Sequence, residues 1–262
     1  VAIGTNTARY NQGVNAVAIG SAAGSTGQGA SAVAIGLNAG FSSQGADSVA
    51  MGQNAAQYSQ GGNSVALGIG AAQYSQSIRA VAIGALAGST GQGDSAVAVG
   101  RDSGFYGQGI DCVAVGDSAG QYSQSNNAVA LGQSAGNCGQ GLVSVAVGSQ
   151  AGASTQGAYS VAIGSSAARY KQGVSSVAIG VNSAYTGQGD NAIAIGSNAG
   201  GTGQGTNSVA LGVNAGNFTQ GNNSIAIGNS AGFCGQGASA IAIGTNAGYT
   251  GQAANSIVIN AT

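Results

Sequence analysis

The sequence contains no proline, no tryptophan and no histidine, and only 4% of its 262 residues are charged. Without proline, and without glycine at every third position, a collagen helix is excluded. Without histidine there is no base for a Ser-His-Asp triad, and no glutamate is present to substitute for it. Nucleic-acid binding needs stripes of basic residues to neutralise phosphates. The net charge of this chain is −1, so we expect no nucleic-acid partner.

Long apolar segments are also missing. No apolar run approaches the roughly 18 to 20 residues of a transmembrane helix, and the N-terminus has no basic and apolar signal-peptide pattern. We therefore expect no membrane insertion. Both ends cut through a repeating pattern, which indicates a fragment or a mature segment of something longer.

Glycine is abundant, with 51 residues, and it belongs to a strict period. Taking Val1 as position 1, a Val or Ile recurs every 16 residues without an insertion, at Val17 and onward to Ile257. Sixteen full repeats are followed by a terminal strand segment, residues 257–262. The repeat covers the whole chain, so we expect a single domain, residues 1–262, without a linker.

Comparison of the repeats shows which of the sixteen positions tolerate different residues and which do not. Position 2 is Ala, position 4 is Gly and position 12 is Gln in every full repeat, and all charges fall at positions 5, 6, 9, 11, 14 and 15. A helix pair needs about 30 residues or more, whereas this repeat allows two short strands and two turns. The predicted fold class is all-β, a parallel β-solenoid of 16-residue coils with about 16 rungs.

Side-chain size alternates from position 16 to position 3, as in residues 208–211, and this predicts a strand with one buried face. We expect positions 1 and 3 to point inward as two apolar ladders, with Ala at position 7 opposite them. Ala at position 2 then faces outward, either for lateral packing against another chain or as a flat solvated face. Gly at positions 4 and 13 is expected at turns that need positive φ or close backbone approach.

Gln at position 12 is the least replaceable polar residue. Stacked about 4.8 Å apart, primary amides can hydrogen-bond from coil to coil and satisfy turn backbone groups, so we favour a structural role over ligand contact. This expected structural ladder comprises Gln12, Gln28, Gln44, Gln60, Gln76, Gln92, Gln108, Gln124, Gln140, Gln156, Gln172, Gln188, Gln204, Gln220, Gln236 and Gln252.

Twelve of the thirteen aromatic residues lie at positions 9 or 10 and therefore line one edge of the solenoid. The candidate interaction edge comprises Tyr58, Tyr74, Phe105, Tyr106, Tyr122, Phe218, Phe233 and Tyr249. The spacing predicts that Tyr58 stacks on Tyr74, and Tyr106 on Tyr122. The edge either shelters the core and packs against neighbouring subunits, which we favour, or grips sugars or a partner fibre.

Motifs that resemble catalytic sequences arise from the repeat itself. Residues 116–120, 132–136 and 228–232 match G-x-S-x-G, but no triad base exists, so we expect no enzyme activity. No Cys-x-x-Cys occurs and the six Asp residues are scattered, so we expect no metal site and no cofactor. Cys138 and Cys234 lie six coils apart, about 29 Å on the rung spacing, so the cysteines are expected to be free thiols.

The unit N-S-V-A-I-G-x-N-A-G, at residues 207–216 and its copies, resembles the head repeats of trimeric autotransporter adhesins. The longer unit T-x-Q-G-x-N-x-A-V-A-I-G, with the ending at residues 254–262, resembles repeat fibre proteins of large DNA viruses and phages. The resemblance implies a left-handed β-roll and a surface-exposed fibre that works as a trimer in attachment.

Our functional hypothesis is a structural fibre or adhesin shaft, extracellular or on a virion surface. We expect self-association as a trimer or an end-to-end filament, with a host-surface receptor or glycan as a further partner. The alternative is an ice-binding solenoid that uses the flat row of Ala at position 2, against which the sequence has no Thr-x-Thr ladder.

Overall fold

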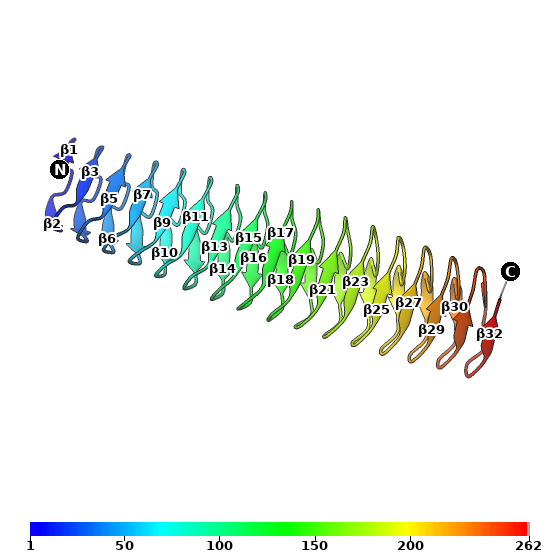
Figure 1. The fold of residues 1–262 in the computed structure, drawn as a ribbon. Coiled ribbons are helices and arrows are strands. Elements are labelled where there is room, and N and C mark those ends of the chain that lie inside the picture. The colour runs from blue at the N-terminus through cyan, green and yellow to red at the C-terminus, as the bar shows by residue number, and fades with distance from the viewer. Residues whose placement is uncertain (261–262) are drawn as a thin grey trace. The chain divides into compact units, whose positions relative to one another are not determined.

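The computed structural model describes residues 1–260, so Ala261 and Thr262 of the predicted terminal segment lie outside the described residues. The chain forms two compact units, Val1–Ala128 and a second that begins at Val129. Each unit is an all-β parallel β-solenoid whose coils follow one another in chain order (Figure 1), which confirms the predicted fold class. The left-handed winding and the single domain over residues 1–262 stay predictions.

Each coil contributes a strand at positions 1–3 to a sheet that we call the Val/Ile sheet, and most coils contribute a strand at positions 10–12 to the Gln sheet. In the first unit the Val/Ile sheet contains β1 (Ala2–Ile3), β3 (Val17–Ile19), β5 (Val33–Ile35), β7 (Val49–Met51), β9 (Val65–Leu67), β11 (Val81–Ile83), β13 (Val97–Val99) and β15 (Val113–Val115). Its Gln sheet contains β2 (Tyr10–Gln12), β4 (Thr26–Gln28), β6 (Ser42–Gln44), β8 (Tyr58–Gln60), β10 (Tyr74–Gln76), β12 (Thr90–Gln92), β14 (Tyr106–Gln108) and β16 (Tyr122–Gln124).

The second unit repeats this arrangement. Its Val/Ile sheet contains β17 (Val129–Leu131), β19 (Val145–Val147), β21 (Val161–Ile163), β23 (Val177–Ile179), β25 (Ile193–Ile195), β27 (Val209–Leu211), β29 (Ile225–Ile227), β31 (Ile241–Ile243) and β32 (Ile257–Ile259). Its Gln sheet contains β18 (Cys138–Gln140), β20 (Ser154–Gln156), β22 (Tyr170–Gln172), β24 (Thr186–Gln188), β26 (Thr202–Gln204), β28 (Phe218–Gln220) and β30 (Cys234–Gln236).

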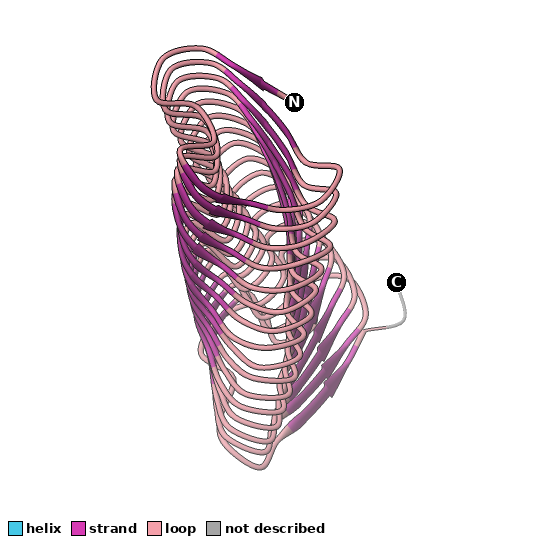
Figure 2. Cartoon of the chain, turned by 90° about the vertical axis from the view of Figure 1, so that its left-hand side faces the viewer, coloured by secondary structure: helices cyan, strands magenta, loops and turns pink. Residues whose placement is uncertain are grey.

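Within each unit, strands pair in parallel with the equivalent strand of the next coil, so like residues stack on like. In the first unit β3 pairs with β5 through Ala18 and Ala34, and β4 pairs with β6 through Gln28 and Gln44. Figure 2 shows the resulting rows of strands, in magenta, with loops joining them. An insertion of even one residue would break this register, because the side chains of a strand alternate between its two faces.

Two tight turns close each coil, at positions 4–7 and 13–16. In the second coil the Ala23 N–H donates to Gly20 O at 3.3 Å, and the Ala32 N–H donates to Gly29 O at 3.4 Å. The third residue of each turn, at positions 6 and 15, has positive φ in every coil, as at Asn38 with 54°. Short polar side chains tolerate this conformation, which explains the abundance of Asn, Ser and Asp at both positions.

Glycine has different roles at position 4, where it is invariant, and at position 13, where Ser77, Ser125 and Ala253 also occur. At position 4 the φ angle of Gly84 is +130°, and a Cβ there would lie 2.6 Å from Gly100 O in the next coil. At position 13 φ is not positive, but a Cβ on Gly29 would lie 2.4 Å from Ala46 N. Position 4 thus needs both the special conformation and the close approach, whereas position 13 needs the close approach alone.

The core consists of small residues and glutamine. From the second coil on, Ala at positions 2 and 7 is buried, as in Ala34 and Ala39, and the position 12 glutamines are 1 to 7% exposed. The prediction that positions 1 and 3 point inward and Ala at position 2 points outward is therefore wrong. Val33 and Ile35 on the same strand are only half-buried, because their side chains lie on the outer face.

The thinness of the interior explains this reversal. Gln28 crosses from the Gln sheet to the Val/Ile sheet, where its Nε2 lies 2.8 Å from Val17 O, so one glutamine side chain spans the whole gap. Branched side chains directed into this space would overlap the amide, whereas Ala fits beside it. The row of Ala predicted as an ice-binding or lateral-packing face is inside the coil, so neither use applies to it.

We predict that Gly84→Ala lowers the free energy of unfolding by at least about 2 kcal/mol, because it adds backbone strain and a backbone clash. Urea denaturation followed by circular dichroism measures the change. The matched control is Gly91→Asn at position 11, where φ is +69° and the nearest contact to an added Cβ is 3.9 Å, at Gly107. Asn11 occupies this position in the first coil, so the control should change stability by less than about 0.5 kcal/mol. Equal effects of the two substitutions would contradict the assigned role of position 4.

Candidate functional site

The outer face of the Val/Ile sheet is a continuous apolar surface within each unit. Positions 1 and 3 place Val, Ile, Leu or Met side by side in every coil, and none of these side chains is buried. The most exposed in the body of the two sheets are Met51, Ile83, Val115, Leu131, Ile163, Ile193, Leu211 and Ile243, at 36 to 43%. Val, Ile, Leu and Met side chains usually face a core. The outer face of the Val/Ile sheet is therefore a candidate interface.

From Gln28 onward, the position 12 glutamines are buried and connect the two sheets. In the fifth coil, Gln76 Nε2 donates to Val65 O at 3.0 Å and to Ala80 O at 3.2 Å. The same amide donates to Gln92 Oε1 in the next coil at 3.0 Å. Hydrogen bonds between the side-chain amides of neighbouring coils also join Gln60 to Gln76, Gln108 to Gln124, Gln188 to Gln204 and Gln236 to Gln252. The hydrogen bonds to the backbone and those between coils both stabilise the fold. Because these amides are buried, they are not available to contact a ligand.

Aromatic rings meet in small groups along the edge formed by positions 9 and 10. Tyr58 stacks on Tyr74 at 5.7 Å between ring centres, and Tyr106 stacks on Tyr122 at 5.9 Å, as the spacing predicts. Phe105 packs edge-on against Tyr106 at 4.4 Å. In the second unit, Phe218 contacts Phe233 edge-on at 5.3 Å, and Phe233 stacks on Tyr249 at 4.9 Å. The structure thus brings the predicted edge residues together within three separate groups.

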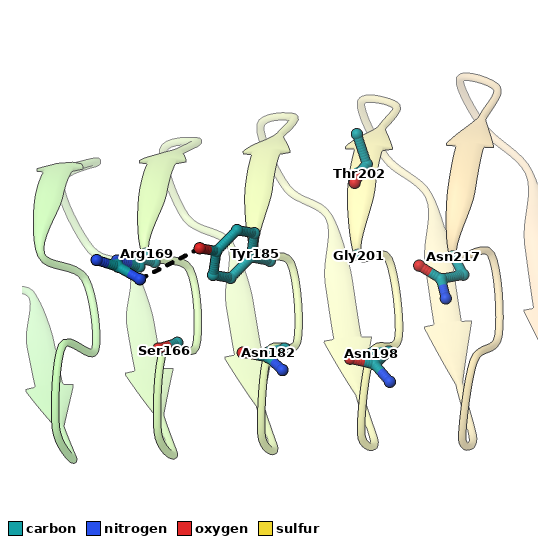
Figure 3. Close-up of a pocket in the computed structure, with 8 residues that line it drawn as sticks. All are labelled: Ser166, Arg169, Asn182, Tyr185, Asn198, Gly201, Thr202 and Asn217. Atoms are coloured by element: carbon teal, nitrogen blue, oxygen red, sulfur yellow. Dashed lines mark hydrogen bonds between the residues drawn. The ribbon is translucent and has the colours of Figure 1, made fainter.

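The second unit has a polar hollow beside this edge. This open hollow has a volume of about 300 Å³ and is lined by Ser166, Arg169, Asn182, Tyr185, Asn198, Gly201, Thr202 and Asn217. Figure 3 shows the position 6 side chains in one row and the position 9 residues in another, with Thr202 apart from both. Our sequence prediction missed this site, although Gly201 is the only glycine at position 9 and was an available signal.

Charges form one ion pair among residues 1–260. Arg101 Nη2 lies 2.6 Å from Asp117 Oδ2, as expected for position 5 of adjacent coils. The hydrogen bond from Arg101 lowers the pKa of Asp117, and a second one from Ser118 acts in the same direction. Both side chains are exposed, so the pair contributes little to stability.

The cysteines are free thiols, as predicted, and burial raises the pKa of Cys112. Across residues 1–260, no three His, Cys, Asp or Glu side chains lie close enough together to hold a metal ion. The same residues form no helix of the length and apolar character that a membrane span requires.

Residues 142–167, 172–199 and 204–231 match the model of the YadA head domain repeat (2 copies), a repeat of trimeric autotransporter adhesin heads. The matched coils of the second unit are thus similar to a structural, non-catalytic repeat of a surface-exposed adhesin. No curated protein matches the chain. The resemblance to viral and phage fibres stays a prediction.

We predict that Gln76→Glu lowers the free energy of unfolding at neutral pH by about 3 kcal/mol or more, because a buried carboxylate would face Val65 O and Ala80 O. Burial raises the pKa of such a carboxyl group above its unfolded value of about 4.3, so the loss should shrink as pH falls and the acid is protonated. Urea denaturation at pH 4 and pH 8, each compared with the unsubstituted chain, tests this sign.

The control for this substitution is Gln73→Glu at position 9 of the same coil. Gln73 is half-buried on the outer edge, where its Nε2 donates to Gln57 Oε1 at 2.9 Å. Its substitution should cost less than about 1 kcal/mol at either pH. The structural role of Gln76 would be contradicted if both variants lost a similar free energy of unfolding. It would also be contradicted if the loss in Gln76→Glu grew as pH falls.

Proposed function

We propose that this chain is a repeat region of a surface-exposed, adhesin-like structural protein, and that its copies associate side by side as a trimer. The observation that supports this most strongly is the outer face of the Val/Ile sheet. Side chains such as Leu211 and Ile163 are about 40% exposed there and repeat in every coil. Monomeric proteins rarely expose contiguous apolar surface over more than a few hundred Å².

A second copy of the chain is the partner that this face fits best. Its charge-free rows of Val and Ile offer shape and apolar area but no polar group to select an unrelated ligand. Parallel copies would place the same regular rows against one another over many coils, and symmetric packing of identical surfaces is the usual route to an oligomer. The match to repeats of trimeric adhesin heads favours three copies.

Attachment is the proposed role of the surface that remains outside such a trimer. Positions 5, 6, 9, 11, 14 and 15 contain all the charges of the chain, and the aromatic groups lie at positions 9 and 10. These positions offer contacts for a host-surface receptor or glycan. The same comparison supports an extracellular location, whereas the end-to-end filament and the virion location stay predictions.

The double variant Ile163→Lys, Leu211→Lys should dissociate the trimer, because each lysine would be buried without a partner. We expect the concentration at which trimers dissociate to rise by about 100-fold or more. Analytical ultracentrifugation over a concentration series measures the mass directly. A monomeric mass for the unsubstituted chain over the whole series would refute the proposal.

Val143→Lys is the matched control. Val143 is 45% exposed at position 15, on the turn, and has positive φ like Arg79 at the same position of an earlier coil. The repeat therefore accepts a long basic side chain there. This variant should retain the mass of the unsubstituted chain, and its dissociation would argue against the Val/Ile sheet as the interface.

A further inference from the structure

The hollow at Gly201 exists because one side chain is missing from a row. Arg169, Tyr185 and Asn217 occupy the equivalent position in neighbouring coils, and the hollow opens where Gly201 leaves a gap between Tyr185 and Asn217 (Figure 3). Its volume of about 300 Å³ is at the lower end of the range for small-molecule sites. A single sugar ring is a ligand of suitable size.

A guanidinium group is fixed at one end of this hollow. Arg169 Nη1 donates to Tyr185 Oη at 3.2 Å, and Arg169 Cζ lies 5.0 Å from the ring centre of Tyr170 and 5.9 Å from that of Tyr185. Arg169 makes no other side-chain hydrogen bond and no ion pair to the residues that the structure describes. Its remaining N–H groups are free to bind, and their planar fork matches a carboxylate.

No acidic side chain competes for that guanidinium. The residues that line the hollow include no Asp or Glu, and Asp190 is the only acid in the sequence after residue 128. Asp190 accepts a hydrogen bond from Val174 N at 2.8 Å on the turn at positions 13–16. Arg169 and Lys171 are the basic residues of the sequence after residue 128, which therefore has one more basic than acidic side chain.

Side-chain amides supply polar contacts along the rest of the wall. Asn198 Nδ2 donates to Asn214 Oδ1 at 3.2 Å, which fixes the amide and leaves its oxygen free. The Asn182 side chain makes no hydrogen bond within residues 1–260, so its donor and acceptor are both available. Amides pair with hydroxyl groups as donor or as acceptor, and the Tyr185 ring offers an apolar surface beside them.

We propose that the hollow at Gly201 binds a carboxylated sugar ring, with the carboxylate on Arg169, the ring beside Tyr185 and hydroxyl groups on Asn182 and Asn198. Sialic and uronic acids share this chemistry. The proposal rests on the proposed attachment function and gives it a ligand class.

The test uses the full 262-residue chain. Saturation-transfer NMR and calorimetric titration would measure the binding of N-acetylneuraminic acid, glucuronic acid and neutral galactose. We expect at least one of the two acids to bind, and galactose to bind at least about tenfold more weakly, because it lacks the charge-assisted pair. Failure of both acids to bind would overturn the proposal, as would equal binding of galactose.

Two substitutions test whether the sugar binds in this hollow. Gly201→Phe fills the gap with the residue that position 9 already has in Phe41 and Phe105, and the nearest atom to its Cβ is Asn217 Oδ1, the far end of a flexible side chain. This variant should lose at least about tenfold in affinity, and so should Arg169→Gln, which removes the partner of the carboxylate. Undiminished binding by either variant would overturn the site.

Arg9→Gln is the control. Arg9 also lies over the ring of the tyrosine that follows it, at 5.0 Å from Tyr10, but its next coil has Ser25 in place of a tyrosine at position 9. Its substitution should leave affinity unchanged, and a tenfold loss would place binding elsewhere. A trimeric chain that binds no acid refutes this inference alone, whereas a monomeric chain that binds acids refutes only the proposed assembly.

Discussion

The two strands of each coil are held one glutamine side chain apart, because the amide at position 12 donates to the carbonyl oxygens at positions 1 and 16. This spacing leaves room inside only for small side chains, which are Ala, Ser and Cys112, and for the glutamine itself. Branched residues on the same strand must therefore turn outward, where a globular protein would bury them. The apolar outer face, and the assembly proposed from it, are consequences of this narrow interior.

Hydrogen bonds replace bulky apolar packing as the source of order in this fold. Each strand pairs with its copy in the next coil, the turns at positions 4–7 and 13–16 close internally, and the amides cross the remaining space. Glycines such as Gly84 allow successive backbones to approach to distances at which a Cβ would clash. Because identical residues meet along the rows at positions 2, 4 and 12, a residue suited to one coil there suits the next, and this explains why the period is so strict.

The sequence alone predicted the coil length, the two strands and the two turns, because invariant Gly and Gln mark them in every repeat. It failed on the direction of the side chains. Alternation of small and large residues shows that one face of a strand is buried, but Val33 and Ala34 satisfy that pattern equally well in either direction. Which of the two side chains faces inward depends on the thickness of the interior. That thickness is known only when the position of Gln44 across the coil is known. The hollow was missed for a related reason, since a single Gly201 acquires meaning only beside Tyr185 and Asn217 in space.

Position 9 stands apart from these constraints. Eight different residue types occupy it along the chain, from Gly201 to Phe105 and Arg169, and the backbone is the same around each of them. Each coil therefore offers one site at which a single codon change alters the outer surface while the scaffold is preserved. An array of such coils can diversify its recognition chemistry stepwise, and duplication of a coil adds a further site of variation without requiring a new fold.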